Sequence, residues 1–280
     1  MKPQVECAFP GEELLGECPL WDDRAGLLWW IDILAPALKC SDGKIHPLDE
    51  AIGSFAFREK GGILAAMKSG FWFFEEKRQI ASPEKDKPAN RLNDGRCDRQ
   101  GRFWAGTMME TMRKPEGALY RLSPDGKCVS FRSGITVPNS LCWSPDGRTM
   151  YFADSPTRRI LAFDYDTASG EPSNERLFAT TEVGFPDGSC IDADGCLWNA
   201  EYGGWRVVRY TPAGKIDRVI ELPVQNATCC AFGGKNLDTL FITTARQRLS
   251  DVELQKQKLA GSVLAVRPGS TGLVESRFKG

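Results

Sequence analysis

The sequence predicts an all-β fold, a six-bladed β-propeller that forms a single domain over residues 1–280. Three observations favour it: a turn-and-strand pattern occurs six times, the predicted strands are short, and no amphipathic helix of three turns is recognisable. Short strands bounded by turns, repeated about every 40 to 50 residues, are typical of propeller blades. A pair of β-sandwiches is the alternative, and the register shared by the six copies disfavours it.

The clearest copy begins with the turn sequence at 143–147, where Pro145 and Gly147 favour turn dihedral angles. Two β-rich runs follow it, at 149–154 and 160–165. The other copies begin at Trp21, Lys60, Asp98, Asp192 and Gly233. We expect the N-terminal strand at 4–8 to pair with the last blade, which closes the ring and hides both edges. Residues 255–260 are expected to form a short helical insert.

Composition excludes several classes of protein. The formal net charge is −1, whereas a nucleic-acid-binding protein needs an excess of cations, so no nucleic-acid partner is expected. Hydrophobic residues make up 41% of the chain, enough for a core. No apolar run approaches the ~20 residues that cross a membrane, and residues 1–15 do not resemble a secretory signal. We therefore expect a cytoplasmic protein with no membrane association and no obligatory protein partner.

The ten cysteines include no C-x-x-C pair, and we expect them to be reduced and mostly buried, with a disulfide set as the less favoured alternative. His46 is the only histidine, which excludes sites built from two or three histidines. It lies in a turn-like segment and is interpreted as a surface residue. Any hydrolytic chemistry is therefore expected to run without imidazole.

The shared register also predicts a site. The aligned turn positions are 25, 62, 101, 147, 195 and 236, and the residue eight places before each of them is polar. These six residues are Glu17, Ser54, Asn93, Asn139, Asp187 and Thr228. Equivalent positions on the innermost strands of a radial array should converge near one mouth of the central channel. For Ser54 and Thr228 the favoured interpretation is that the hydroxyl satisfies a backbone group.

Glu17, Asn139 and Asp187 are predicted to hold one divalent metal ion. Two carboxylates brought together repel each other unless a cation lies between them. Two acids and an amide oxygen suit a hard cation such as Ca²⁺, Mg²⁺ or Mn²⁺, and Zn²⁺ also accepts oxygen ligands.

Arg91 lies two residues before Asn93, so both side chains point to the same face of a strand. An arginine beside a cation site is explained by an oxygen-rich substrate between them. A simple ion pair with a neighbouring carboxylate is the alternative, and nothing in the sequence decides between the two.

The segments that carry these residues resemble the senescence-marker-protein/gluconolactonase family, which includes regucalcin. The matches run from 16–21 to 232–236, and the specific ones are at 90–95, 103–108, 139–143 and 186–192. The resemblance implies a six-bladed propeller with one divalent cation at the channel mouth and, in many members, hydrolysis of sugar lactones. It implies Glu17, Asn139 and Asp187 as metal ligands, Arg91 and Asn93 as substrate-binding residues, and Asp187 as the catalytic proton acceptor and donor.

Three positions depart from the family pattern. Cys18 and Ser140 stand where relatives often have Gly or another small residue. A glutamate that holds sugar hydroxyls in some relatives aligns with Thr111, and Glu110 is expected to take that substrate-binding role only if the loop is shifted.

The function expected from these residues is metal-dependent hydrolysis of a sugar lactone to an aldonic acid. A calcium-binding regulatory protein without turnover and an esterase or organophosphate hydrolase on the same scaffold are the alternatives. A protein-interaction platform is disfavoured, because it does not need two acids and an arginine at one mouth. We expect the loops after Thr107 and around 202–205 to select the lactone.

Overall fold

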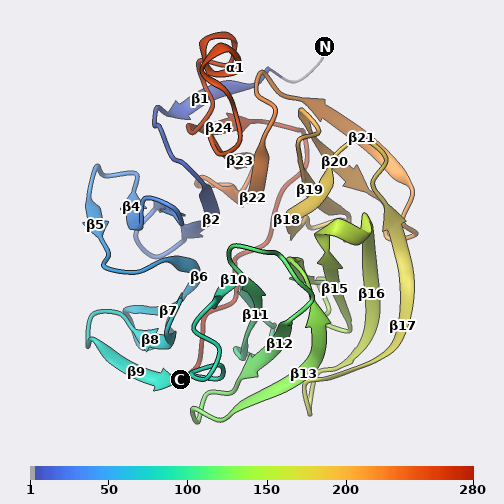
Figure 1. The fold of residues 1–280 in the computed structure, drawn as a ribbon. Helices are drawn as coiled ribbons and strands as arrows, with labels where there is room; N and C mark the ends of the chain where they lie inside the picture. Colours follow the sequence, from blue (N-terminus) through green and yellow to red (C-terminus); the bar gives the residue numbers. More distant parts are fainter. Residues whose placement is uncertain (1–3) are drawn as a thin grey trace.

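The computed structural model describes residues 4–280 and contains six four-stranded antiparallel sheets arranged in a ring, a six-bladed β-propeller (Figure 1). The innermost strands are β2 (Gly16–Asp22), β6 (Ile52–Phe57), β10 (Asn90–Cys97), β14 (Pro138–Trp143), β18 (Phe185–Ile191) and β22 (Ala227–Gly233). Each contacts the innermost strand of the next blade, and β22 contacts β2, so the ring is closed. The predicted fold class is confirmed.

The remaining strands follow in order toward the outside of each blade. The second strands are β3 (Leu27–Asp32), β7 (Ile63–Met67), β11 (Phe103–Met109), β15 (Thr149–Asp154), β19 (Leu197–Tyr202) and β23 (Thr239–Thr244). The third strands are β4 (Ala37–Cys40), β8 (Gly70–Phe73), β12 (Gly117–Leu122), β16 (Arg159–Asp166), β20 (Arg206–Tyr210) and β24 (Val263–Val266). The outermost strands are β5 (Ile45–Pro47), β9 (Arg78–Ala81), β13 (Cys128–Ile135), β17 (Glu171–Thr180), β21 (Ile216–Glu221) and, in the sixth blade, β1 (Glu6–Phe9).

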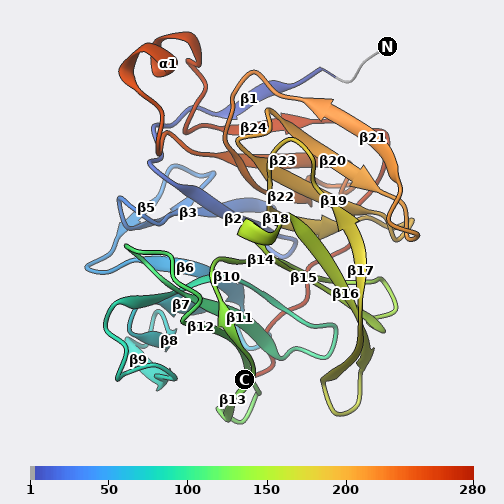
Figure 2. The same ribbon diagram turned by 45° about the vertical axis from the view of Figure 1, so that its right-hand side comes forward.

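The sixth blade combines the N-terminal strand with three strands from the last part of the sequence. Strand β1 pairs with β24, so the N-terminal strand completes the last blade as predicted (Figure 2). The pairing covers an edge of β24 that would otherwise present free backbone groups. The pairing of β1 with β24 therefore stabilises the ring by hydrogen bonds between segments far apart in the sequence.

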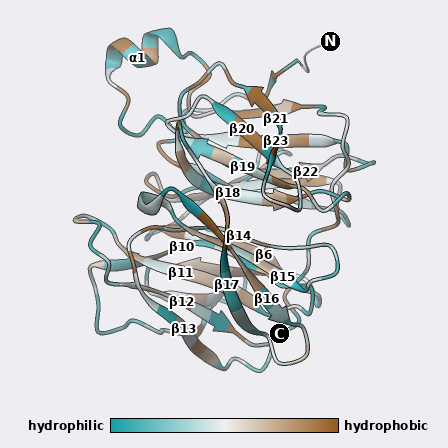
Figure 3. Ribbon diagram, turned by 90° about the vertical axis from the view of Figure 1, so that its right-hand side faces the viewer, coloured by the Kyte–Doolittle hydropathy of each residue, from teal (hydrophilic) through white to brown (hydrophobic). Residues whose placement is uncertain are grey.

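The hydrophobic core is divided among the blade interfaces. Each of the six buried clusters of residues 4–280 lies between two neighbouring blades. Inner and second strands therefore bury both faces, which is why β6 and β14 are buried at every position rather than at alternate ones. Figure 3 shows hydrophobic colour concentrated on the strands, while outer strand β17 is largely hydrophilic.

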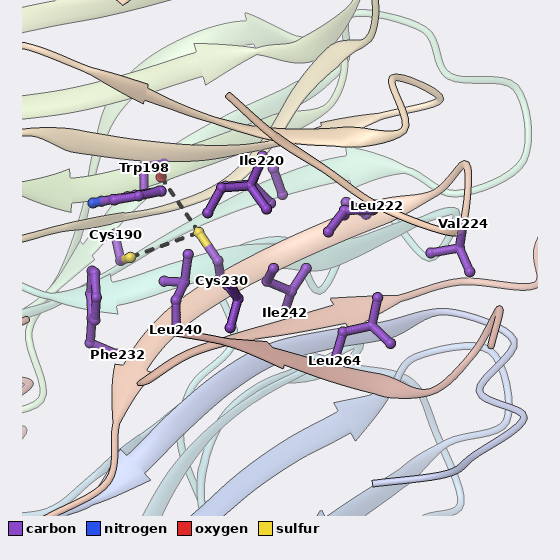
Figure 4. Packing of buried hydrophobic residues seen from close by; sticks show 14 of the residues in the cluster. Cys190, Trp198, Ile220, Leu222, Val224, Cys230, Phe232, Leu240, Ile242 and Leu264 are labelled. Atoms are coloured by element: carbon purple, nitrogen blue, oxygen red, sulfur yellow. Dashed lines mark hydrogen bonds between the residues drawn. The ribbon is translucent and has the colours of Figure 1, made fainter. Parts of the chain in front are cut away.

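The ten cysteines are all free thiols, and eight of them are buried. Between blades five and six, the Sγ atoms of Cys190 and Cys230 lie 3.7 Å apart, and the Cys230 thiol donates to the backbone oxygen of Trp198 at 3.6 Å (Figure 4). The thiols act here as small core side chains, as predicted.

Two sequence predictions need correction. The short helix α1 (Asp251–Lys256) begins earlier than the expected 255–260, because Ser250 and Glu253 form a reciprocal N-terminal capping box. His46 lies on outer strand β5 and is half-buried rather than a free surface residue. Its ring stacks on Trp29, with the ring centroids 6.0 Å apart, and meets the edge of Phe74.

The C-terminal tail, residues 267–280, crosses the end of the ring at which the innermost strands finish. Gly272 bridges to Asp192 after β18, and Phe278 bridges to Arg58 after β6. Glu275 forms an ion pair with Arg96 of β10 between these points. Figure 1 shows this segment, in red, passing behind the innermost strands toward the C-terminus. In residues 4–280 no helix is long and apolar enough to span a lipid bilayer.

Candidate functional site

The six residues selected by register all lie on the innermost strands. The pairing of each of these strands with its neighbour shifts register near its start, at Glu17/Leu20, Ile52/Ser54, Leu92/Gly95, Asn139/Cys142, Pro186/Ser189 and Ala227/Cys229. Such bulges bend a strand locally and change the direction of its side chains. A repeated bulge at one end of the ring therefore presents several polar groups to the same space.

A cavity of about 220 Å³ opens at this end of the channel. Its lining includes five residues predicted from the sequence, namely Glu17, Arg91, Asn93, Asn139 and Asp187. Ser54 and Thr228 do not line it. The Ser54 hydroxyl donates to the backbone oxygen of Asn93 at 2.8 Å, and that of Thr228 donates to the backbone oxygen of Gly16. Both hydroxyls satisfy backbone groups, as predicted.

Glu17 and Asp187 place two carboxyl groups against each other. Burial, followed by the negative charge of Asp94, raises the pKa of Glu17 to about 8. Burial, followed by the charge of Glu17, raises the pKa of Asp187 well above its ordinary value. Two neighbouring buried acids whose ionised forms are both disfavoured gain most from a cation placed between them.

Asn139 offers a third oxygen. Its Nδ2 donates to Ser155 Oγ at 2.7 Å, and Ser155 Oγ donates in turn to the backbone oxygen of Pro186 at 2.6 Å. This chain ties up the amide nitrogen, while Oδ1 accepts a hydrogen bond from Asn93 Nδ2 at 3.2 Å. The side chain is thereby oriented by a residue of the 3₁₀ turn at Ser155–Thr157.

These three residues fit a hard divalent cation. Within residues 4–280, no group of three or more His, Cys, Asp and Glu side chains is placed to hold a metal ion. The ligand set predicted here includes an amide oxygen. Two carboxylates, one amide oxygen and water suit Ca²⁺, Mg²⁺ or Mn²⁺. Glycine after Asp187 allows the fifth and sixth blades to approach here, because a Cβ on Gly188 would lie 2.2 Å from Cys229 Sγ.

Arg91 is buried beside this carboxylate pair, with 5% of its surface exposed. Its Nη1 donates to Asn93 Oδ1 at 2.7 Å and to the backbone oxygen of Leu92 at 3.0 Å. Its Nε has no hydrogen-bond partner within residues 4–280 and lies 3.8 Å from Glu110 Oε1. Burial lowers the pKa of Arg91 to about 10, which leaves the guanidinium charged at neutral pH. The contact with Glu110 fits the interpretation as an ion pair, and the unsatisfied Nε fits the interpretation as a group that binds a substrate oxygen.

Glu110 and Thr111 do not line the cavity. The Glu110 carboxylate forms an ion pair with Lys68 Nζ at 2.8 Å besides its contact with Arg91. Its observed contacts are therefore with Lys68 and Arg91, and the substrate contact expected of it stays a prediction.

Several lining residues were not predicted individually. Tyr202 and Arg113 come from the two segments expected to select the lactone, and Gln247 and Arg248 come from the connection between β23 and α1. Apolar side chains complete the wall; they are Leu15, Met108, Val137, Pro156 and Phe185. The repeat pattern carries no signal for these residues, because the connecting loops differ in length from blade to blade.

The chain is similar to known proteins over most of its length. The model of the SMP-30/gluconolactonase/LRE-like region matches residues 15–246. The chain is 35% identical to 6-deoxy-6-sulfogluconolactonase of Pseudomonas putida, with 100% of both chains covered, and 34% identical to regucalcin of Xenopus laevis, with 99% of each covered. The crystal structure of a calcium-binding protein, regucalcin, from Agrobacterium tumefaciens has a TM-score of 0.93 at 30% identity, covering 100% of this chain and 98% of that one.

Proposed function

The chain belongs to the SMP-30/gluconolactonase/LRE-like family, and from this premise we propose that it hydrolyses a sugar lactone to the corresponding aldonic acid. The observation that carries the proposal is the single cavity surface shared by Glu17, Asn139, Asp187, Arg91 and Asn93. It combines a ligand set for a divalent cation with hydrogen-bonding groups for a substrate rich in oxygen.

In this proposal Glu17, Asn139 and Asp187 hold one divalent cation. When bound, such a cation lowers the pKa of a water molecule and polarises the carbonyl of an ester. The side chains of this site supply the remaining requirements, which are proton transfer and orientation.

Asp187 is the proposed proton carrier. Its carboxylate accepts the proton of the attacking water as the water oxygen bonds to the lactone carbonyl carbon. The ring C–O bond then breaks, and Asp187 returns the proton to the departing alkoxide oxygen. The product is an open-chain hydroxy acid, which releases a proton to solvent at neutral pH.

Arg91 and Asn93 are the proposed substrate-binding residues. The Arg91 guanidinium and the Asn93 amide are already held together at 2.7 Å, so they present a fixed pair of groups to the sugar oxygens. Orientation of the ring in this way contributes to rate by reducing the entropy lost on reaching the transition state.

Removal of divalent cations is expected to abolish the activity. Purified protein in weak buffer should acidify a solution of an aldonolactone, and prior chelation should lower the rate by about 100-fold or more. Separate addition of Ca²⁺, Mg²⁺, Mn²⁺ and Zn²⁺ should restore it and identify the effective ion. An unchanged rate in excess chelator would contradict the metal role. Cation binding without acid release from any lactone would instead favour the calcium-binding alternative.

Ser155→Ala tests the support of the Asn139 amide. Loss of the hydroxyl frees Asn139 Nδ2, and loss of a group that orients a ligand typically weakens metal affinity by about 10- to 100-fold. Calorimetric titration of the chelated protein with Ca²⁺ measures the change. Thr157→Ala is the matched control, because this exposed hydroxyl of the same turn bonds only the Asp154 backbone oxygen and the Arg159 backbone N–H. Equal affinities for the two variants would show that Ser155 plays no part in the site.

A further inference from the structure

Two arginines at the rim of the cavity have no role in the proposed reaction as described so far. Arg113 lies in the connection between β11 and β12 of the third blade, and Arg248 lies between β23 and α1 of the sixth. In a ring of six blades, the third and sixth are opposite each other. The two arginines therefore come from opposite blades and line the same cavity.

The charge of Asp187 acts on Arg113, but neither arginine is in an ion pair with it. Among residues 4–280, no ion pair or side-chain hydrogen bond involves Arg113 or Arg248, although nearby Arg91 and Arg246 pair with Glu110 and Glu12. The pKa of Arg113 is lowered by burial and then by the positive charge of Arg248, so the two charges are close enough to repel. In the proposed function the bound cation takes up the Asp187 carboxylate, so the two like charges are left to attract an anion that binds between them.

The backbone is strained at both positions. Arg113 has φ of 48° and Arg248 has φ of 65°, in the left-handed region that disfavours residues with a Cβ. Such conformations cluster at ligand sites, where the surrounding structure holds them in place.

The Arg248 backbone is held at the adjacent residue. The Gln247 backbone N–H donates to the Leu14 backbone oxygen at 2.9 Å. The Gln247 backbone oxygen accepts from Asn226 Nδ2 at 2.9 Å and from the Tyr202 hydroxyl at 3.1 Å. The exposed guanidinium of Arg248 therefore projects from an anchored segment.

We propose that the natural lactone carries an anionic group at the carbon farthest from its ring ester, and that Arg113 and Arg248 bind this group. The inference rests on the proposed lactonase function and specifies its substrate class. Three arginines against two carboxylates line the cavity, and a bound dication adds further positive charge. Because the guanidinium fork fits phosphate, sulfonate and carboxylate, the group is an oxyanion of one of these kinds. The rim arginines bind the distal charge while Arg91 and Asn93 contact the ring.

The test compares kcat/KM for four six-carbon aldonolactones. One is unsubstituted, and the others carry a terminal phosphate, sulfonate or carboxylate. The wild type is expected to favour at least one anionic lactone by about 10-fold or more, and the preferred one identifies the oxyanion. Arg113→Gln and Arg248→Gln should each lower the ratio of anionic to neutral kcat/KM by about 10-fold. Arg267→Gln, at an exposed arginine outside the cavity lining, removes the same charge and should leave the ratio unchanged.

A neutral lactone hydrolysed as well as all three anionic ones would overturn the proposal, as would an unchanged ratio in both rim variants. Thermal unfolding of each variant shows whether it is folded. Turnover of no lactone at all would contradict the proposed function rather than the anion site. In that case, calorimetric titration with the four open-chain acids decides the inference: tighter binding of a terminally charged acid, lost in Arg248→Gln, supports it, and equal binding overturns it.

Discussion

Asp187→Asn is expected to lower kcat for lactone hydrolysis by about 10²- to 10⁴-fold, the range that proton transfer by a positioned side chain contributes. The amide keeps an oxygen that faces the cavity but cannot accept the proton of the attacking water. It also removes one of the two carboxylates that repel each other, so the variant should remain folded. Initial rates of acid release at saturating lactone and saturating divalent cation measure the effect.

Asp194→Asn is the matched control for this substitution. Asp194 lies seven residues further along the same blade, and its carboxylate is largely exposed, with 73% of the side chain accessible. The substitution Asp194→Asn makes the same change of charge far from the cavity and should alter kcat by less than about twofold. If Asp187→Asn retained the wild-type rate, Asp187 would not be the proton carrier, and the buried acid Asp94 would become the group to test next.

Phe278→Ala is expected to lower the free energy of unfolding by about 3–5 kcal/mol, the usual cost of removing a buried phenylalanine side chain. Phe278 is fully buried in the cluster between the second and third blades, where its ring centroid lies 6.3 Å from that of Phe73. The substitution leaves a void in this interface and detaches the end of the tail from it. Urea denaturation followed by tryptophan fluorescence measures the change.

Val274→Ala is the control on the same tail, because this side chain is 51% exposed. It should change the free energy of unfolding by no more than about 0.5 kcal/mol. A small effect of Phe278→Ala would mean that the tail is bound by its hydrogen bonds and ion pairs rather than by its buried aromatic ring.

The fold and the cavity residues on the innermost strands were predictable because the same sequence pattern repeats in every blade. Each blade has the same strand order, so a turn such as 143–147 sets the register of the strand before it and identifies Asn139. The same register selects Glu17 and Asp187, and the structure brings these three residues to one cavity. Side chains two residues apart in a strand point to the same face, and this rule was enough to add Arg91 to the predicted site.

The cavity rim could not be predicted in this way. Arg113 and Arg248 occupy loops whose length and backbone conformation are particular to one blade, including a positive φ at each arginine. The short helix α1 shows a different limit. The pair Ser250 and Glu253 marks its start in the sequence, and this capping box places the helix before the predicted 255–260.

The position of the C-terminal tail affects how substrate and product reach and leave the cavity. The tail crosses the ring from Asp192 to Arg58 and is paired with Arg96 between them, at the end where the innermost strands finish. We therefore expect reactant and product to enter and leave at the other end, where the cavity lined by Arg113 and Arg248 lies. In the proposed reaction the acid product is more negative than the lactone, so Arg113 and Arg248 are expected to slow the release of the product as well as to attract the reactant.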